Sequence, residues 1–170
     1  MTLGIKALTI ENWLQPDPTS TIFVQLSHSD GSVSPMSGED WAAQFLTPSL
    51  AATVPEELRK LFEVARGAMA YGYFFYPLYA LAGEQLYRVA EAAVSEKYTR
   101  LGATKKLSFQ DKIKFLLDNS VITDEQFLGW DAIRHLRNMS SHPQQQSILP
   151  PGMVATMLYR VAEKINDLFP

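Results

Sequence analysis

The sequence has no cysteine, only three histidines, and few charged residues, which make up 19% of its 170 positions. Without cysteine the chain has no disulfide, no thiolate zinc site and no cysteine nucleophile. The same absence fits a reducing compartment, so we expect a cytoplasmic location. Because 46% of the residues are hydrophobic, the low charge predicts a packed globular domain and excludes a disordered chain.

An overall positive charge is also lacking, since the net charge is −3 and the pI is about 5.6. Proteins that coat nucleic acid without sequence preference are usually basic, so a nucleic-acid role here must depend on a local patch. One basic stretch, residues 97–114, contains a single carboxylate, Asp111. Its lysines either form a solvated surface, or Lys105 and Lys106 contact phosphate or RNA. Its six cations are Lys97, Arg100, Lys105, Lys106, Lys112 and Lys114.

Long hydrophobic runs are missing as well. The uncharged stretch 67–83 falls short of the roughly 20 apolar residues that a membrane-spanning helix needs, and it contains Gly72 and Pro77. We expect a buried helix–turn–helix corner there and no membrane association. The N-terminus "MTLGIKALTIENW" has no basic start followed by an apolar run, so we expect no signal peptide.

Residues 53–170 carry helical signals throughout and predict an all-α, antiparallel bundle of about five helices. Thr53 with Glu56, and Thr123 with Gln126, have the spacing of capping boxes at two helix starts. Apolar side chains recur at helical spacing in five segments, which span 55–72, 74–100, 108–119, 124 into the motif described below, and 150 onward.

Residues 1–52 have a different pattern and are predicted to be a short mixed extension that packs on the bundle. "STIFVQLSHSDGSVS" is typical of a strand followed by a turn at Asp30 and Gly31. "SGEDWAAQFL" predicts a short helix capped by Ser37.

The motif "RHLRNMSSHP" at residues 134–143 suggests a site that handles phosphate. Arg137 supplies a permanent forked cation, and His142 titrates near neutrality and can exchange protons. On a straight helix the two would lie about 140° apart. However, His142 precedes Pro143, a position biased away from helix, so we expect the helix to unwind at Ser141 and free the imidazole.

Other chemistries are not supported by the sequence. His135 and His142 lie seven residues apart, roughly 10 Å along a helix, which is too far to share a metal ion. The sequence contains no HExxH, G-x-S-x-G, phosphate-loop or dinucleotide-loop pattern. We therefore predict no metal and no cofactor.

Five helices with "RNMSSH" at the end of the fourth resemble a HEPN domain, most closely the small stand-alone HEPN-like proteins of unknown function. The likeness covers about residues 55–169, and "LYRVAEAAV" with Arg88 and Glu91 resembles a further segment of that family. Arg134 is predicted to form part of a solvated face or to add a supplementary basic contact to phosphate. The resemblance implies that Arg137 and His142 form a catalytic pair that Asn138, Ser141, Arg88 and Glu91 support. It also implies a homodimer in which two motifs line one cleft.

Two functions follow from this resemblance. The first is a metal-independent endoribonuclease of a toxin–antitoxin or phage-defence system, with an antitoxin-type protein partner. The second is a non-catalytic dimeric module that binds a nucleotide, RNA or a protein. The motif alone better fits a helix end where the arginine snorkels and the histidine faces the negative pole of the helix dipole. The resemblance favours the role at phosphate.

Overall fold

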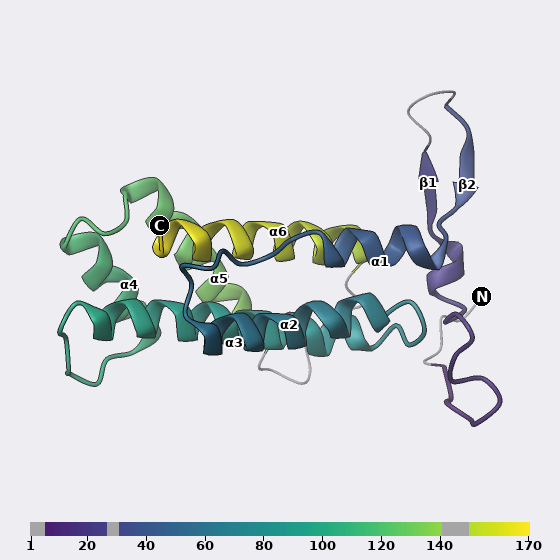
Figure 1. Ribbon diagram of the computed structural model, residues 1–170, viewed down its shortest axis with the longest axis horizontal. Helices are drawn as coiled ribbons and strands as arrows, with labels where there is room; N and C mark the ends of the chain where they lie inside the picture. The colour runs from purple at the N-terminus through teal and green to yellow at the C-terminus, as the bar shows by residue number, and fades with distance from the viewer. Residues whose placement is uncertain (1–5, 27–30, 141–149) are drawn as a thin grey trace.

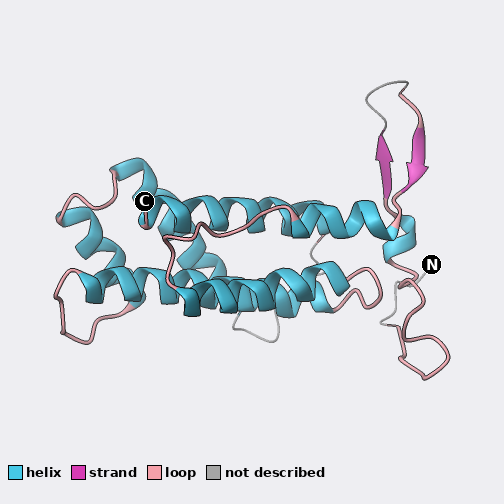
Figure 2. Cartoon of the chain, in the orientation of Figure 1, coloured by secondary structure: helices cyan, strands magenta, loops and turns pink. Residues whose placement is uncertain are grey.

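The computed structural model describes residues 6–26, 31–140 and 150–170. Within these ranges the chain forms six α-helices and one short strand pair, which confirms the all-α prediction (Figures 1 and 2). The elements in chain order are the 3-10 helix η1 (Ser20–Ile22), β1 (Val24–Leu26), β2 (Val33–Pro35), α1 (Gly38–Leu46), α2 (Glu56–Tyr71), α3 (Leu78–Arg100), α4 (Phe109–Asp118), α5 (Asp124–Ser140) and α6 (Pro151–Leu168).

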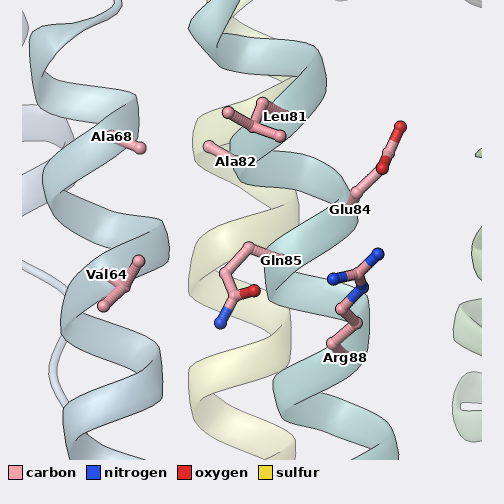
Figure 3. A pocket seen from close by; sticks show the side chains of 7 residues that line it. All are labelled: Val64, Ala68, Leu81, Ala82, Glu84, Gln85 and Arg88. Atoms are coloured by element: carbon pink, nitrogen blue, oxygen red, sulfur yellow. The ribbon is translucent and has the colours of Figure 1, made fainter.

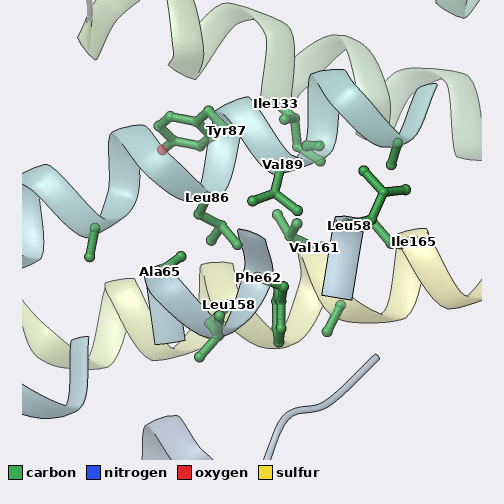
Figure 4. Close-up of a cluster of buried hydrophobic side chains, with 14 of the residues drawn as sticks. Leu58, Phe62, Ala65, Leu86, Tyr87, Val89, Ile133, Leu158, Val161 and Ile165 are labelled. Carbon is green, nitrogen blue, oxygen red and sulfur yellow. The ribbon is translucent and has the colours of Figure 1, made fainter. Parts of the chain in front are cut away.

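Helix α3 is the central element, because it contacts α2, α4, α5 and α6. Ten of its 23 residues are buried, as expected for a helix covered on several faces. Figure 4 shows part of the core where these helices meet. The labelled side chains are Leu58, Phe62 and Ala65 from α2, Leu86, Tyr87 and Val89 from α3, Ile133 from α5, and Leu158, Val161 and Ile165 from α6.

The predicted helix starts are confirmed at α1 and α5 and differ at α2 and α3. At α1, Ser37 is the N-cap, and its hydroxyl accepts from the Asp40 N–H at 3.1 Å. At α5, Thr123 and Gln126 form the predicted reciprocal capping box, with N–H···O distances of 2.9 and 3.2 Å. The predicted cap at Thr53 is wrong: Pro55 is the N-cap of α2, and the Thr53 hydroxyl donates to the carbonyl of Phe169 at 2.6 Å. Helix α3 begins later than predicted, after Pro77, because the preceding residues form turns.

The first part of the chain is fixed to the turn between α2 and α3. The buried Asp17 carboxylate accepts hydrogen bonds from the backbone N–H groups of Thr19 and Tyr76, both at 2.9 Å. Trp41 and Phe45 of α1 are buried in the same core as the bundle helices, and the Trp41 indole N–H donates to the Tyr79 hydroxyl. The extension therefore packs on the bundle; the domain boundary near residue 52 stays a prediction.

The predicted strand and turn belong to a two-stranded hairpin. β1 and β2 pair antiparallel, with Val24 opposite Pro35 and Leu26 opposite Val33. Gly31 has a φ of 69°, in the left-handed region that suits a turn glycine. Asp30 lies outside the described residues. Figure 1 shows the hairpin projecting from one end of the bundle.

Candidate functional site

Arg137 lies on the face of α5 that packs into the bundle. Trp130 and Ile133 are buried on this face, and positions seven and four residues after them fall on the same side of a helix. Where another apolar side chain would continue the stripe, the chain has a guanidinium. Its side chain is 41% exposed, so the cation lies at the boundary between core and solvent.

Glu91 of α3 holds this guanidinium. Its Oε2 lies 3.0 Å from Nη2 of Arg137, and the glutamate side chain is 31% exposed. Nη1 of Arg137 also donates to Oδ1 of Asn138 at 3.3 Å. The structure thus brings together three residues that the sequence placed at the site: Arg137, Glu91 and Asn138. Glu91 is positioned by α3, on which Tyr87 and Ala90 are buried beside it.

Arg134 takes part in a second group one turn earlier. Its Nε donates to Oδ1 of Asp131 at 2.7 Å, and its Nη2 lies 2.7 Å from Nε2 of His135. The hydrogen bond from Arg134 holds the pKa of the Asp131 carboxyl below its ordinary value. Asp131 was missed at the sequence level, although its spacing of three residues from Arg134 is a recognised helix-pair signal.

The His135 ring has two competing contacts at the same nitrogen. Nε2 also lies 3.4 Å from Oδ2 of Asp131, but it cannot donate to that carboxylate while accepting from Arg134. The contact to Arg134 is much the shorter, so we infer that Nε2 accepts. Arg134 therefore bridges Asp131 and His135, and a phosphate contact at Arg134 would compete with both.

Arg88 is exposed on α3, three residues before Glu91. It lines a groove of about 210 Å³ on the surface of α2 and α3. Figure 3 shows Val64 and Ala68 of α2 beside Leu81 of α3, with Arg88 farther along α3. The groove wall is largely apolar, and Arg88 is the only cation among its lining residues.

Lys105 and Lys106 are remote from the Arg137–Glu91 pair. They lie exposed in the segment between α3 and α4, beyond Arg100. Arg100 follows Glu91 by nine residues, which places the end of α3 about 14 Å from the ion pair along the helix axis. The lysines therefore cannot contact the same phosphate as Arg137.

His142 and Ser141 lie outside the described residues, so the pairing of Arg137 with His142 stays a prediction. In the described part of the chain, no three histidine, aspartate or glutamate side chains gather as a metal site. Nor does that part contain a helix of the length and apolar character needed to cross a membrane.

The described geometry is suited to binding an anion. A guanidinium carries a permanent charge and donates in a planar fork that matches phosphate oxygens. Glu91 fixes its position and offsets part of its charge. No protein-family model, curated protein or solved structure matches the chain.

Proposed function

We propose that this chain is a HEPN-like protein that acts on RNA as a metal-independent endoribonuclease, with Arg137 and His142 at the phosphate. The observation that carries the proposal is the ion pair of 3.0 Å between Arg137 on α5 and Glu91 on α3. Two segments far apart in the sequence, each chosen for its likeness to the same family, meet at this contact. A surface arginine that only covered a helix end would need no such partner.

The proposed reaction needs no metal. A base, which we assign to His142, removes the proton from a ribose 2′-hydroxyl. The 2′-oxygen attacks the adjacent phosphorus, and Arg137 stabilises the charge that develops on the phosphorane oxygens. The bond from phosphorus to the 5′-oxygen then breaks, an acid protonates that oxygen, and a 2′,3′-cyclic phosphate remains. Glu91 would hold the guanidinium in place before the substrate arrives.

We also propose that the chain forms a homodimer through the outer face of α5. Four exposed apolar residues lie within an arc of about 80° on this helix, opposite its buried face. They are Leu128, Ala132, Leu136 and Met139.

The charges of α5 fit an antiparallel pairing of two copies. Asp124, Glu125 and Asp131 lie in its first half, whereas Arg134, His135 and Arg137 lie in its second half. A twofold axis across the helix would set each acidic half against the basic half of the other copy. An antitoxin-type protein partner remains part of the proposal.

The nuclease proposal is tested with His142→Ala in the full chain. We expect the wild type to cleave RNA in EDTA and to leave a cyclic phosphate, and we expect the variant to lose at least 100-fold in rate, as is typical when a general acid–base group is removed (about 10²–10⁴). His135→Ala is the matched control, because this histidine of α5 is 64% exposed and contacts Arg134 and Asp131, not Arg137; it should cleave normally. Circular dichroism verifies folding.

The outcome separates the two functions. Equal cleavage by wild type and His142→Ala would refute the proposed chemistry. If the wild type cleaves no RNA but binds it, and Arg137→Ala weakens that binding, the chain is the non-catalytic binding module instead.

A further inference from the structure

Six cations gather where α3 ends and α4 begins, and we call them the basic corner: Lys97, Arg100, Lys105, Lys106, Lys112 and Lys114. One carboxylate, Asp111, lies among them in the sequence, and Glu96 directly precedes them. Glu96 pairs with Arg100 at 2.8 Å, and Asp111 accepts from the Ser108 hydroxyl at 2.7 Å at the start of α4. Three of the lysines are exposed to solvent: Lys105 and Lys106 in the loop, and Lys114 on α4.

Two buried aromatic rings hold part of this charge in place. The Lys97 amine and the Arg100 guanidinium each lie 5.5 Å from the ring centre of Phe169. The Lys112 amine lies 5.9 Å from the Tyr98 ring. Because Phe169 and Tyr98 are buried, they cannot stack on bases, and they instead favour the cations over their faces.

Backbone and hydroxyl contacts fix the same region. The Tyr98 hydroxyl donates to the carbonyl of Lys105 at 3.0 Å, which ties the loop to α3. The Lys112 amine donates to the Ser95 hydroxyl at 2.9 Å, which ties α4 to α3. These contacts hold the side chains of Lys97, Arg100 and Lys112 in place, while the exposed amines of Lys105, Lys106 and Lys114 add to the positive charge of the basic corner. The net charge of the whole chain is −3.

We infer that the basic corner binds the phosphates of single-stranded RNA that also reaches the Arg137–Glu91 pair. This inference rests on the proposed function. The end of α3 lies about 14 Å from the pair along the helix axis, so a polymer can reach both places whereas a single nucleotide cannot. Lysine amines are point charges without a fixed fork, which suits a flexible backbone and gives no sequence preference.

An acidic protein would be attracted by the same charge. RNA is favoured because one polyanion accounts for both the corner and the guanidinium at the end of α5. The corner would then contribute to affinity for long RNA and leave the chemical step unchanged.

The test compares two double variants of the full chain. Lys105→Gln with Lys106→Gln removes two exposed cations from the corner, and Lys60→Gln with Arg160→Gln removes two exposed cations on α2 and α6. The probe is fluorescein-labelled oligouridylate with 2′-O-methyl groups, which cannot be cleaved through its 2′-hydroxyls. Fluorescence anisotropy measures its affinity over a range of salt concentrations.

If the corner variant loses two phosphate contacts, the slope of log K against log[salt] should decrease in magnitude by about 1.4. Its affinity near 0.1 M salt should be about 25-fold weaker than that of the wild type. The control variant should bind like the wild type. Equal affinity of the corner variant and the wild type, or no binding by the wild type, would overturn the inference. So would displacement of the RNA by polyglutamate at equal charge concentration, since this would indicate an acidic protein as the ligand.

A cleavage assay separates this inference from the proposed function. With a dinucleotide substrate, the corner variant should keep the wild-type rate, whereas His142→Ala should lose it. If no variant and no wild-type protein cleaves, but the corner still determines binding of the uncleavable probe, the nuclease proposal fails and the RNA-binding surface stands.

Discussion

At the residue scale, Arg137 occupies a position where the pattern of α5 calls for an apolar side chain. Trp130 and Ile133 precede it on the same buried face. A charge at such a position is unfavourable unless it is paired, and Glu91 on α3 supplies the partner at 3.0 Å. The two residues therefore depend on each other, and each explains why the other is tolerated beside the core.

Tyr87 makes a residue-scale prediction about pH. Burial raises the pKa of its hydroxyl to about 12, whereas an unfolded tyrosine titrates near 10. The folded chain therefore keeps a proton that the unfolded chain releases, and the contribution to stability, full below about pH 10, is lost as the pH rises toward about 12. A difference of two pKa units corresponds to roughly 2–3 kcal/mol in the free energy of unfolding.

As the pH rises from about 10 to about 12, we expect the free energy of unfolding to fall less for Tyr87→Phe than for the wild type, because phenylalanine has no hydroxyl to titrate. Urea denaturation at a series of pH values measures the difference. Tyr71→Phe is the matched control, because Tyr71 is 64% exposed and its replacement should leave the wild-type pH profile intact. Identical profiles for Tyr87→Phe and the wild type would contradict the assignment.

At the element scale, the turn between α2 and α3 determines how these two consecutive helices pack against each other. Gly72 ends α2, and a Cβ there would overlap the ring of Tyr79 in the first turn of α3. Tyr79 cannot move aside easily, because it is buried and its hydroxyl accepts from Trp41. The glycine therefore permits close packing of this corner.

Two glycine substitutions test this packing. Gly72→Ala should destabilise the fold by about 1–3 kcal/mol, as overpacking typically does. Gly129→Ala is the contrasting change: its Cβ would meet only the flexible end of Lys164, and alanine is favoured over glycine within a helix by up to about 1 kcal/mol. Thermal denaturation gives both values. A Gly72→Ala protein as stable as the wild type would show that the corner is loosely packed.

The elements themselves were largely predictable, and the errors have local causes. Caps such as Thr123 with Gln126 depend on residues three positions apart, so the sequence displays them directly. The Thr53 cap failed because α2 begins at Glu56 with Pro55 as its N-cap, so Thr53 stands two residues too early; its hydroxyl donates to the Phe169 carbonyl instead. The start of α3 was misplaced because the residues before Pro77 are as apolar as the helix that follows, and hydrophobicity alone does not distinguish a buried turn from a helix.

At the scale of the whole molecule, the outer stripe of α5 determines the proposed oligomer. We expect Leu128→Glu to convert a wild-type dimer to a monomer, because it sets two carboxylates in an apolar interface without partners. Leu128 is 69% exposed, so the fold itself should change in stability by about 0.5 kcal/mol or less. Sedimentation equilibrium reports the mass.

Leu81→Glu is the matched control, since Leu81 is 61% exposed on the α2–α3 groove. It should remain dimeric. A monomeric wild type would refute the dimer, and dissociation by Leu81→Glu alone would move the interface to the groove.

The sequence by itself determined the helical class, most helix boundaries, a strand followed by a turn glycine, and the candidate site residues. It could do so because periodicity, capping and turn preferences act between near neighbours in the chain. Only the tertiary structure decided which of those residues meet. Glu91 joins Arg137 because α3 and α5 pack together, whereas Arg88 faces the groove beside α2 and the lysines at 105 and 106 lie beyond the far end of α3. Such pairings depend on how whole helices are placed against one another, which is set by the summed packing of the core and by no single local pattern.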